Sequence, residues 1–532
     1  MRFALTALTA SLAVLAACAS APEATDTAAA RAVATPKQST DAYYVSAAAA
    51  VDERITERGI KPAKNVILFV GDGMGISTIT AARIYAGQSK GLDGESYHLA
   101  MDDLPYSALS KTYSHNFQIS DSAGTATAMV SGVKTLSGVL GVTSAASYGN
   151  CATVAGNETD TLFELAARAG LSAGLVSTAR ITHATPAATY AKVPLRDWEA
   201  DANMRGASSD TCKDIARQLI EWPAGNFDIV LGGGRSKFLA KDTPDPEYAD
   251  QTGERADGRD LTKEWTAKSA DHNFIFDKAG FDATDFTTSA KVLGLFEPSH
   301  MQYELDREKD KAGEPHIADM TRAAITRLSQ DKDGYILMVE GGRIDHGHHG
   351  GNAIRALEDA MAFDLAVATA LEMTNPEETL IIVTADHSHT LTISGYAQRG
   401  NPILGISVAG AGGEGGAMGA DGLPYTTLSY ANGPGACRVN GTDKDGKDIL
   451  DCTRQDLTKV DTLAPDFRQP ALVPLGSETH AGEDVAAFAS GPGDNLISGV
   501  IEQNEIFHVM GRALGLIPAP APVLGAATSP AK

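Results

Sequence analysis

Three near-continuous runs of apolar residues, far apart in the chain, predict buried β-strands. They occupy residues 66–70, 335–339 and 380–384. Their apolar residues are consecutive rather than alternating, which is typical of parallel strands covered on both faces. Two shorter runs, 173–177 and 228–231, predict further buried strands of the same kind.

Apolar residues at helical spacing predict helices around these strands. Residues 42–59 form an amphipathic segment with Tyr44, Ala48, Val51 and Ile55 on one face. A core-facing crossover helix is predicted by a second set that follows the 335–339 run: Ile354, Leu357, Met361, Leu365, Ala368 and Leu371. From Lys64 onward, strand and helix patterns alternate. We therefore expect an α/β fold with a central, largely parallel sheet and helices on both faces.

Other segments lack a clear period. Residues 240–315 are irregular and rich in charge, which predicts a surface excursion. Residues 409–422 hold seven glycines and predict a flexible loop. The proline-rich segment 516–532 is expected to be a disordered tail. The 532 residues suffice for one large domain or two ordinary ones.

The N-terminus predicts export. Residues 1–17 combine one arginine with a short apolar stretch and end before Cys18, as in a bacterial lipoprotein signal. We expect Cys18 to carry the lipid, residues 18–41 to form a flexible tether, and the protein to be periplasmic or at the cell surface. Ordinary signal cleavage at an Ala-x-Ala site is the alternative, and it predicts export as well.

Four further cysteines support an oxidising compartment: Cys151, Cys212, Cys437 and Cys452. An even number in an exported chain predicts two disulfides, for which three pairings are formally possible. We predict the two sequential pairs, Cys151–Cys212 and Cys437–Cys452.

The charge balance limits the partners. The chain carries 67 acidic and 44 basic residues, for a net charge of −23. Such a surface repels nucleic acid and anionic lipid headgroups, so we expect no nucleic-acid partner. A phosphate-containing substrate would need local positive charge, which bound metal ions and an arginine would supply.

Acidic residues and histidines follow each of the three long apolar runs. Asp72 follows the first, Asp345 and His349 follow the second, and Asp386 and His387 follow the third. The carboxyl ends of strands in open α/β sheets are where ligands bind, and these side chains suit two or three divalent cations.

The spacing of residues in the sequence does not identify every ligand of this predicted metal site. Asp345 and His349 are four residues apart and share a face if the chain turns helical there. Three histidines lie between His346 and His349, so spacing alone does not identify the ligand. His480 is a remote histidine among polar residues, and taken singly each histidine fits a core or surface position.

Ser122 stands at the predicted start of a helix, with Asp121 as its N-cap. Taken alone it is a plain capping serine. Beside metal clusters it becomes a candidate nucleophile, because a zinc ion can remove the proton from a hydroxyl. No G-x-S-x-G motif surrounds it, which disfavours a conventional serine hydrolase.

Five motifs in one order resemble the alkaline phosphatase family, and the animal branch more than the best-known bacterial enzyme. They are 65–75 (NVILFVGDGMG), 121–128 (DSAGTATA), 339–349 (VEGGRIDHGHH), 384–389 (TADHSH) and 478–486 (ETHAGEDVA). The resemblance covers residues 42–515, which would form one catalytic domain with a crown-like loop region at 395–435.

The resemblance implies a role for each matching residue. Ser122 would be phosphorylated and Arg196 would clamp the phosphate. The ligands of the first zinc would be Asp345, His349 and His480, and those of the second Asp72, Ser122, Asp386 and His387. A magnesium ion would be bound by Asp72, Thr185 and Glu340, with His183 and His346 nearby. A calcium site would use Glu247, the Phe296 carbonyl, Glu297 and Glu314.

The implied function is a broad-specificity phosphomonoesterase that acts through a phosphoserine, and the implied assembly is a homodimer. Two alternatives are a phosphodiesterase of the same superfamily and a non-catalytic surface lipoprotein that binds phosphate or metal. The Ala-Gly pair after Ser122 excludes a sulfatase, which needs a proline two residues after its nucleophile.

Overall fold

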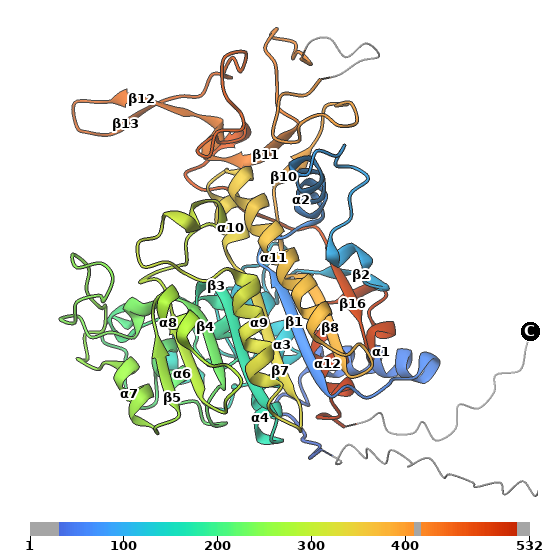
Figure 1. The fold of residues 1–532 in the computed structure, drawn as a ribbon, viewed down its shortest axis with the longest axis vertical. Coiled ribbons are helices and arrows are strands. Elements are labelled where there is room, and N and C mark those ends of the chain that lie inside the picture. Colours follow the sequence, from blue (N-terminus) through green and yellow to red (C-terminus); the bar gives the residue numbers. More distant parts are fainter. Residues whose placement is uncertain (1–30, 409–415, 519–532) are drawn as a thin grey trace, which may run out of the picture.

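The computed structural model describes residues 31–408 and 416–518 and is built around a ten-stranded sheet (Figure 1). In spatial order the strands are β17 (Gly499–Glu502), β2 (Tyr106–Lys111), β16 (Val485–Ser490), β8 (Thr379–Ala385), β1 (Asn65–Gly71), β7 (Tyr335–Gly341), β3 (Ser172–Arg180), β4 (Ile229–Gly233), β6 (Lys291–Leu295) and β5 (His272–Ile275).

All five predicted strands are present, and the seven strands from β8 to β5 run parallel. Every residue of β1, β7 and β8 is buried. In β1, Leu68 belongs to one hydrophobic cluster and Phe69 to the other, because successive side chains point to opposite faces. Two covered faces therefore account for the unbroken apolar runs.

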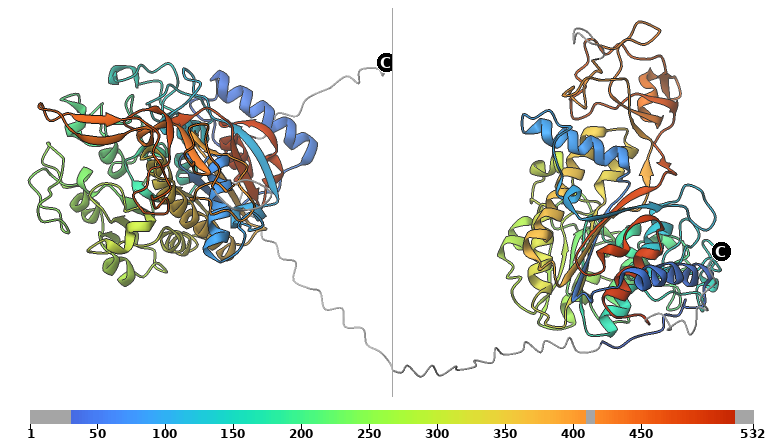
Figure 2. Two further views of the ribbon diagram at one scale, coloured as in Figure 1. Left: turned by 90° about the horizontal axis from the view of Figure 1, so that it is seen from above. Right: turned by 90° about the vertical axis from the view of Figure 1, so that its right-hand side faces the viewer.

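Helices cover both faces, as expected for this fold class. On one face lie α1 (Ala42–Arg58), α3 (Ser122–Ser131), α4 (Leu162–Arg168), α5 (Ala184–Ala187), α6 (Ile215–Ile220), α7 (Leu261–Ala267) and α12 (Glu505–Ala513). On the other lie α2 (Ile76–Ser89), α8 (Lys278–Ala283), α9 (Ile317–Leu328), α10 (Arg343–His349) and α11 (Ala353–Met373). Figure 2 shows α9 and α11 on one side of the sheet and α1 and α12 on the other.

The predicted face of α11 needs one correction. Leu357 is fully buried, but Leu365 is 53% exposed. The buried surface passes instead through Phe363 and Val367, which pack in the cluster shared with α2 and α9. A helix that contacts both neighbours and the sheet buries a broad face, and this face is centred away from Leu365.

A smaller region stands beyond one end of the sheet (Figure 1). It contains the three-stranded sheet of β10 (Leu391–Ile393), β11 (Leu428–Gly433) and β14 (Ala471–Pro474), and the hairpin of β12 (Arg438–Thr442) and β13 (Asp448–Asp451). It extends well past the predicted loop region 395–435. Residues 409–415 of the glycine-rich segment lie outside the described residues.

Both predicted disulfides are present. Cys437 and Cys452 are joined across the base of the β12–β13 hairpin, with their Cα atoms 4.0 Å apart. Cys151 and Cys212 join two loops, with a Cα–Cα distance of 5.9 Å. The sequential pairing is therefore confirmed.

The segment 240–315 is more than a surface excursion. It contains α7, α8 and the edge strands β5 and β6 of the main sheet. The prediction was wrong because many of the charged residues form buried ion pairs inside the protein. Arg235 and Arg255 are fully buried and pair with Asp245 and Asp214, at 2.7 and 2.8 Å.

The described parts of the expected tether and tail pack against the folded domain. Within residues 31–41, the Arg31 guanidinium donates to the carbonyls of Ala63 and Leu514 at 2.9 Å. Gln38 is 3% exposed and bonds to two carbonyls of the domain. Leu516, expected in the tail, is fully buried. The predicted lipidation site Cys18 and most of the predicted tail lie outside the described residues.

No helix among the described residues is long and apolar enough to cross a membrane.

Candidate active site

The predicted metal ligands meet at the carboxyl ends of three adjacent strands. Gly71, the last residue of β1, pairs with Gly341 of β7 and with Ala385 of β8. Asp72 and Asp386 therefore emerge side by side. Both are fully buried, as are Glu340 and His387. The order of strands β8, β1 and β7 thus assembles residues that lie hundreds of positions apart.

The first ligand group is Asp345, His349 and His480. The Nε2 atoms of the two histidines lie 3.3 and 3.4 Å from Asp345 Oδ1 and 3.2 Å from each other. Asp345 and His349 share a face of α10, as their spacing predicts. His480 arrives in the short strand β15 (His480–Ala481), which pairs with β9 (Ser388–His389).

The tautomers of these histidines indicate that a cation fits between them. His349 Nδ1 lies 2.6 Å from the Glu478 carbonyl, and His480 Nδ1 lies 2.8 Å from the Ser120 carbonyl. A carbonyl only accepts, so each Nδ1 carries the proton and each Nε2 presents a lone pair. Two lone pairs and a carboxylate oxygen then converge, and a bound metal ion would remove their repulsion.

His389 joins this group, although no role had been predicted for it. Its Nε2 lies 2.8 Å from Asp345 Oδ1 and its Nδ1 lies 2.5 Å from Glu478 Oε2. Burial disfavours the charged ring, but the hydrogen bonds to Asp345 and Glu478 raise the pKa of His389 to about 10. Its two nitrogens thus link the carboxylates of Asp345 and Glu478, and the ring also belongs to the group of side chains close enough to hold a metal ion.

The second group surrounds Ser122. Its hydroxyl lies 3.3 Å from Asp72 Oδ1 and 3.1 Å from His387 Nε2. His387 Nε2 is in turn 3.3 Å from Asp72 and 3.3 Å from Asp386. Burial and the neighbouring carboxylates raise the pKa values of Asp72 and Asp386, so a cation here would stabilise their charged forms.

Ser122 is the first residue of α3, with Asp121 as its N-cap, as predicted. Asp121 Oδ1 accepts from the backbone N–H of Gly124 at 3.3 Å and of Gly138 at 2.9 Å. Its Oδ2 lies 3.1 Å from Nη1 of Arg196. Burial alone would raise the pKa of Asp121, but the Arg196 charge and these hydrogen bonds lower it. Asp121 thus fixes both the start of α3 and the Arg196 guanidinium.

The third group consists of Asp72, Glu340, Thr185 and His183. A ligand atom of Asp72, of Glu340 and of His183 lie within 4.8 Å of one another. Asp72 Oδ2, Glu340 Oε1 and Thr185 Oγ1 are buried without a hydrogen-bond partner. Burial and the charges of two nearby aspartates raise the pKa of Glu340 to about 7. Buried oxygens without partners suit a hard cation.

His183 and His346 lie beside the site, together with His300, which sequence reasoning missed. The ring centroids of His300 and His346 are 4.1 Å apart. Both nitrogens of His300 face donors of Arg180. His183, His300 and His346 also form a group whose nitrogen atoms lie within 4.8 Å of one another, close enough to hold a metal ion. His300 lies outside the five motifs, and no local pattern marks it.

The predicted calcium group is partly assembled. The structure brings Glu247 and Glu297 together with Asp310. Burial and neighbouring carboxylates raise the pKa of Glu297 to about 7. The side chain of Glu314 instead accepts from the Gln302 backbone N–H at 3.0 Å. Phe296 is buried beside this group. Asp310 was missed because the chain around it has no regular pattern.

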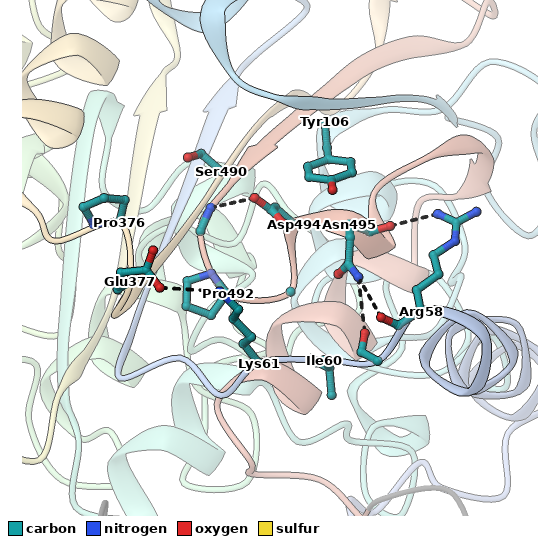
Figure 3. Close-up of a pocket in the computed structure, with 13 residues that line it drawn as sticks. Arg58, Ile60, Lys61, Tyr106, Pro376, Glu377, Ser490, Pro492, Asp494 and Asn495 are labelled. Carbon is teal, nitrogen blue, oxygen red and sulfur yellow. Dashed lines mark hydrogen bonds and ion pairs between the residues drawn. The ribbon is translucent and has the colours of Figure 1, made fainter. Parts of the chain in front are cut away.

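A separate hollow of about 590 Å³ lies far from these side chains. Figure 3 shows its lining, which includes Arg58, Tyr106, Ser490 and Asn495. Ser490 pairs with Ile381 at the amino-terminal end of β8, opposite the end that carries Asp386. This hollow contains no predicted site residue.

Known proteins match this arrangement. The family model described as alkaline phosphatase matches residues 63–516. The chain belongs to the alkaline phosphatase family. It is 43% identical over 457 residues to alkaline phosphatase of Gadus morhua, covering 85% of this chain and 91% of that protein. It is also 43% identical over 458 residues to the tissue-nonspecific isozyme of Homo sapiens, covering 85% and 83% of the two chains.

Bacterial alkaline phosphatases share the fold. The Thermus thermophilus enzyme superposes with a TM-score of 0.59 at 25% identity, covering 86% of this chain and 92% of that chain. The enzyme from the Antarctic bacterium TAB5 gives 0.57 at 23% identity, covering 86% and 100%. The protein is thus a phosphomonoesterase of a metal-dependent family, and the resemblance predicted from its motifs is confirmed.

Proposed function

We propose that the protein releases inorganic phosphate from phosphate monoesters through a phosphoserine at Ser122, with two zinc ions and one magnesium ion per chain. The observation that carries this proposal is the position of the Ser122 hydroxyl. It lies at the N-terminus of α3, within 3.3 Å of Asp72 and 3.1 Å of His387, beside the Arg196–Asp121 pair.

The ligand assignment follows the three groups. The first zinc would be held by Asp345, His349 and His480, and the second by Asp72, Ser122, Asp386 and His387. Magnesium would be held by Asp72, Thr185 and Glu340. When bound, these ions lower the pKa of the serine hydroxyl and offset negative charge on the reacting phosphate.

The residues of the chain then perform the displacement. The Ser122 oxygen forms a bond to phosphorus while the bond between phosphorus and the alcohol oxygen breaks, and the alcohol takes up a proton. The N–H groups at the start of α3 and the Arg196 fork stabilise the phosphate oxygens. Water then attacks phosphorus, breaks the bond to Ser122 and releases phosphate. Neither step requires a particular alcohol, which supports broad specificity.

Metal analysis combined with paired substrates tests this function. The purified protein should contain about two zinc ions and one magnesium ion per chain, and should hydrolyse a phosphate monoester far faster than the corresponding methyl diester. A faster reaction with the diester would favour the phosphodiesterase alternative. Metal binding without hydrolysis of either ester would favour the non-catalytic alternative.

We further propose that the protein is exported, anchored through a lipid on Cys18, and homodimeric. The signal-like residues 1–18 and the two disulfides support export, and the family resemblance supports the dimer. Labelling of cells with a radioactive fatty acid should mark the wild-type protein but not Cys18→Ala. Light scattering of the protein without its first 30 residues should give twice the chain mass.

A further inference from the structure

A second hollow, of ≈ 530 Å³, opens beside the Arg196 guanidinium. Its lining includes three apolar side chains, Phe117, Leu136 and Tyr148, and also Asp121 and Arg196. We call it the Phe117 hollow. Phosphoryl chemistry at Ser122 does not require it.

The Phe117 hollow is continuous with the phosphate site through shared residues. Arg196 and Asp121, which meet at 3.1 Å, belong to both. The Arg196 backbone N–H donates to the Gly138 carbonyl at 2.8 Å, and the Gly138 N–H donates to Asp121. A phosphate held by Arg196 would therefore have its ester group within reach of this hollow.

Two exposed aromatic side chains flank it. Phe117 is 56% exposed and Tyr148 is 59% exposed. Single exposed aromatics are ordinary, but two that line one hollow beside a candidate catalytic arginine form a stacking surface. Tyr148 lies over Gly138, where a Cβ atom would come within 2.7 Å of the ring. Gly138 also has a φ of +81°, so this close approach depends on glycine.

Phe117 is held by the loop that leads into α3. The Phe117 backbone N–H donates to Ser114 Oγ at 3.2 Å, and its carbonyl accepts from the Ser114 N–H at 3.1 Å. The same loop contains Ser120, whose carbonyl accepts from His480. The loop therefore connects the Phe117 hollow to a candidate zinc ligand, and its hydrogen bonds hold the backbone of Phe117 in place.

We propose that the Phe117 hollow binds an aromatic ring carried by the alcohol of the substrate, so that the enzyme favours monoesters of ring-bearing alcohols. This inference rests on the proposed phosphomonoesterase function and names the substrate class that the site prefers. The exposed carboxylate of Asp197 at the rim, together with Asp121, disfavours a second negative charge on the ring. The preferred ring is neutral or cationic.

Two substrates and a small set of variants test the proposal. Butyl phosphate and 2-phenylethyl phosphate are both esters of primary alcohols, and only the second carries a ring. Phe117→Ala and Tyr148→Ala should each lower kcat/KM for 2-phenylethyl phosphate by about 3- to 10-fold and change that for butyl phosphate by less than about twofold. Tyr148→Phe should behave like the wild type. Tyr106→Ala removes an equivalent exposed ring at the distant hollow of Figure 3 and should change neither value.

Inhibition of the wild-type enzyme gives a second measurement that needs no variant. The inhibition constant of 2-phenylethylphosphonate should be lower than that of butylphosphonate by a similar factor. Equal constants, or equal losses on both esters in the two alanine variants, would overturn the ring subsite alone. Tighter binding of the ring-bearing phosphonate with no hydrolysis of either ester would support the subsite and overturn the proposed function.

Discussion

The contact between Asp121 and Arg196 allows a quantitative test of how the chain positions its phosphate clamp. Asp121→Asn keeps the size of the side chain and one oxygen for the Gly124 and Gly138 N–H groups. It replaces the oxygen that faces Arg196 with an N–H donor, so the ion pair is lost. We expect Arg196 to lose its fixed position while α3 keeps its cap.

The magnitude follows from the geometry. The contact is 3.1 Å long, and the two side chains are 19% and 20% exposed. A hydrogen bond between charged groups contributes about 1.5–3 kcal/mol, and partial exposure reduces this to about 1–2 kcal/mol. If that energy holds Arg196 in its phosphate-binding position, the inhibition constant of inorganic phosphate should rise about 5- to 30-fold.

A double-mutant cycle identifies the cause. In an Arg196→Ala background, Asp121→Asn should change the phosphate inhibition constant by less than about twofold, because the partner is already absent. Asp197→Asn removes the same charge from the next residue but no bond to Arg196, and it serves as the control. The reasoning is refuted if Asp121→Asn weakens phosphate binding equally with and without Arg196.

Four further predictions concern the nucleophile, the metals, the disulfides and pH. Ser122→Ala should abolish acid-stable phosphoenzyme, measured with radioactive substrate, while zinc content stays unchanged; covalent phosphate on this variant would show another nucleophile. His480→Ala should lower the zinc content. Zinc added to the chelator-treated wild type should raise its melting temperature, and this rise should be absent in His480→Ala. An unchanged response to zinc would exclude His480 as a ligand. Replacing Cys437 and Cys452 by serine should lower the free energy of unfolding, measured in urea, by at most about 3 kcal/mol, because the loop between them is short. A larger loss would point to a wider structural role of this disulfide. The pKa of Glu340 is raised to about 7, above that of an unfolded glutamate, so the metal-free folded state binds more protons than the unfolded state. Its stability should therefore fall as pH rises from about 5 to 8. Glu340→Gln should flatten this pH dependence in thermal melts, and an unchanged slope would assign the dependence to other groups.

Local pattern was sufficient for much of the fold. The strands β1, β7 and β8 and the helix α1 were predicted to within about two residues, because continuous apolar runs and helical spacing directly reflect burial. The edge strands of the sheet were harder to predict. In β5 and β6 the runs are short, and the flanking charged residues belong to internal ion pairs that composition cannot distinguish from surface charge.

By itself, the sequence determined the fold class, the three strand ends that carry the acidic residues and histidines, the capped helix that begins at Ser122, and the family. These features depend on local spacing and on motifs that keep their order. Only the tertiary structure decided which histidines converge. His480 is brought into place by pairing of β15 with β9, and His389 links Asp345 to Glu478. His300 and Asp310 carry no local signal at all. Their positions follow from loops that other elements hold in place, and such contacts between distant residues leave no periodic trace in the chain.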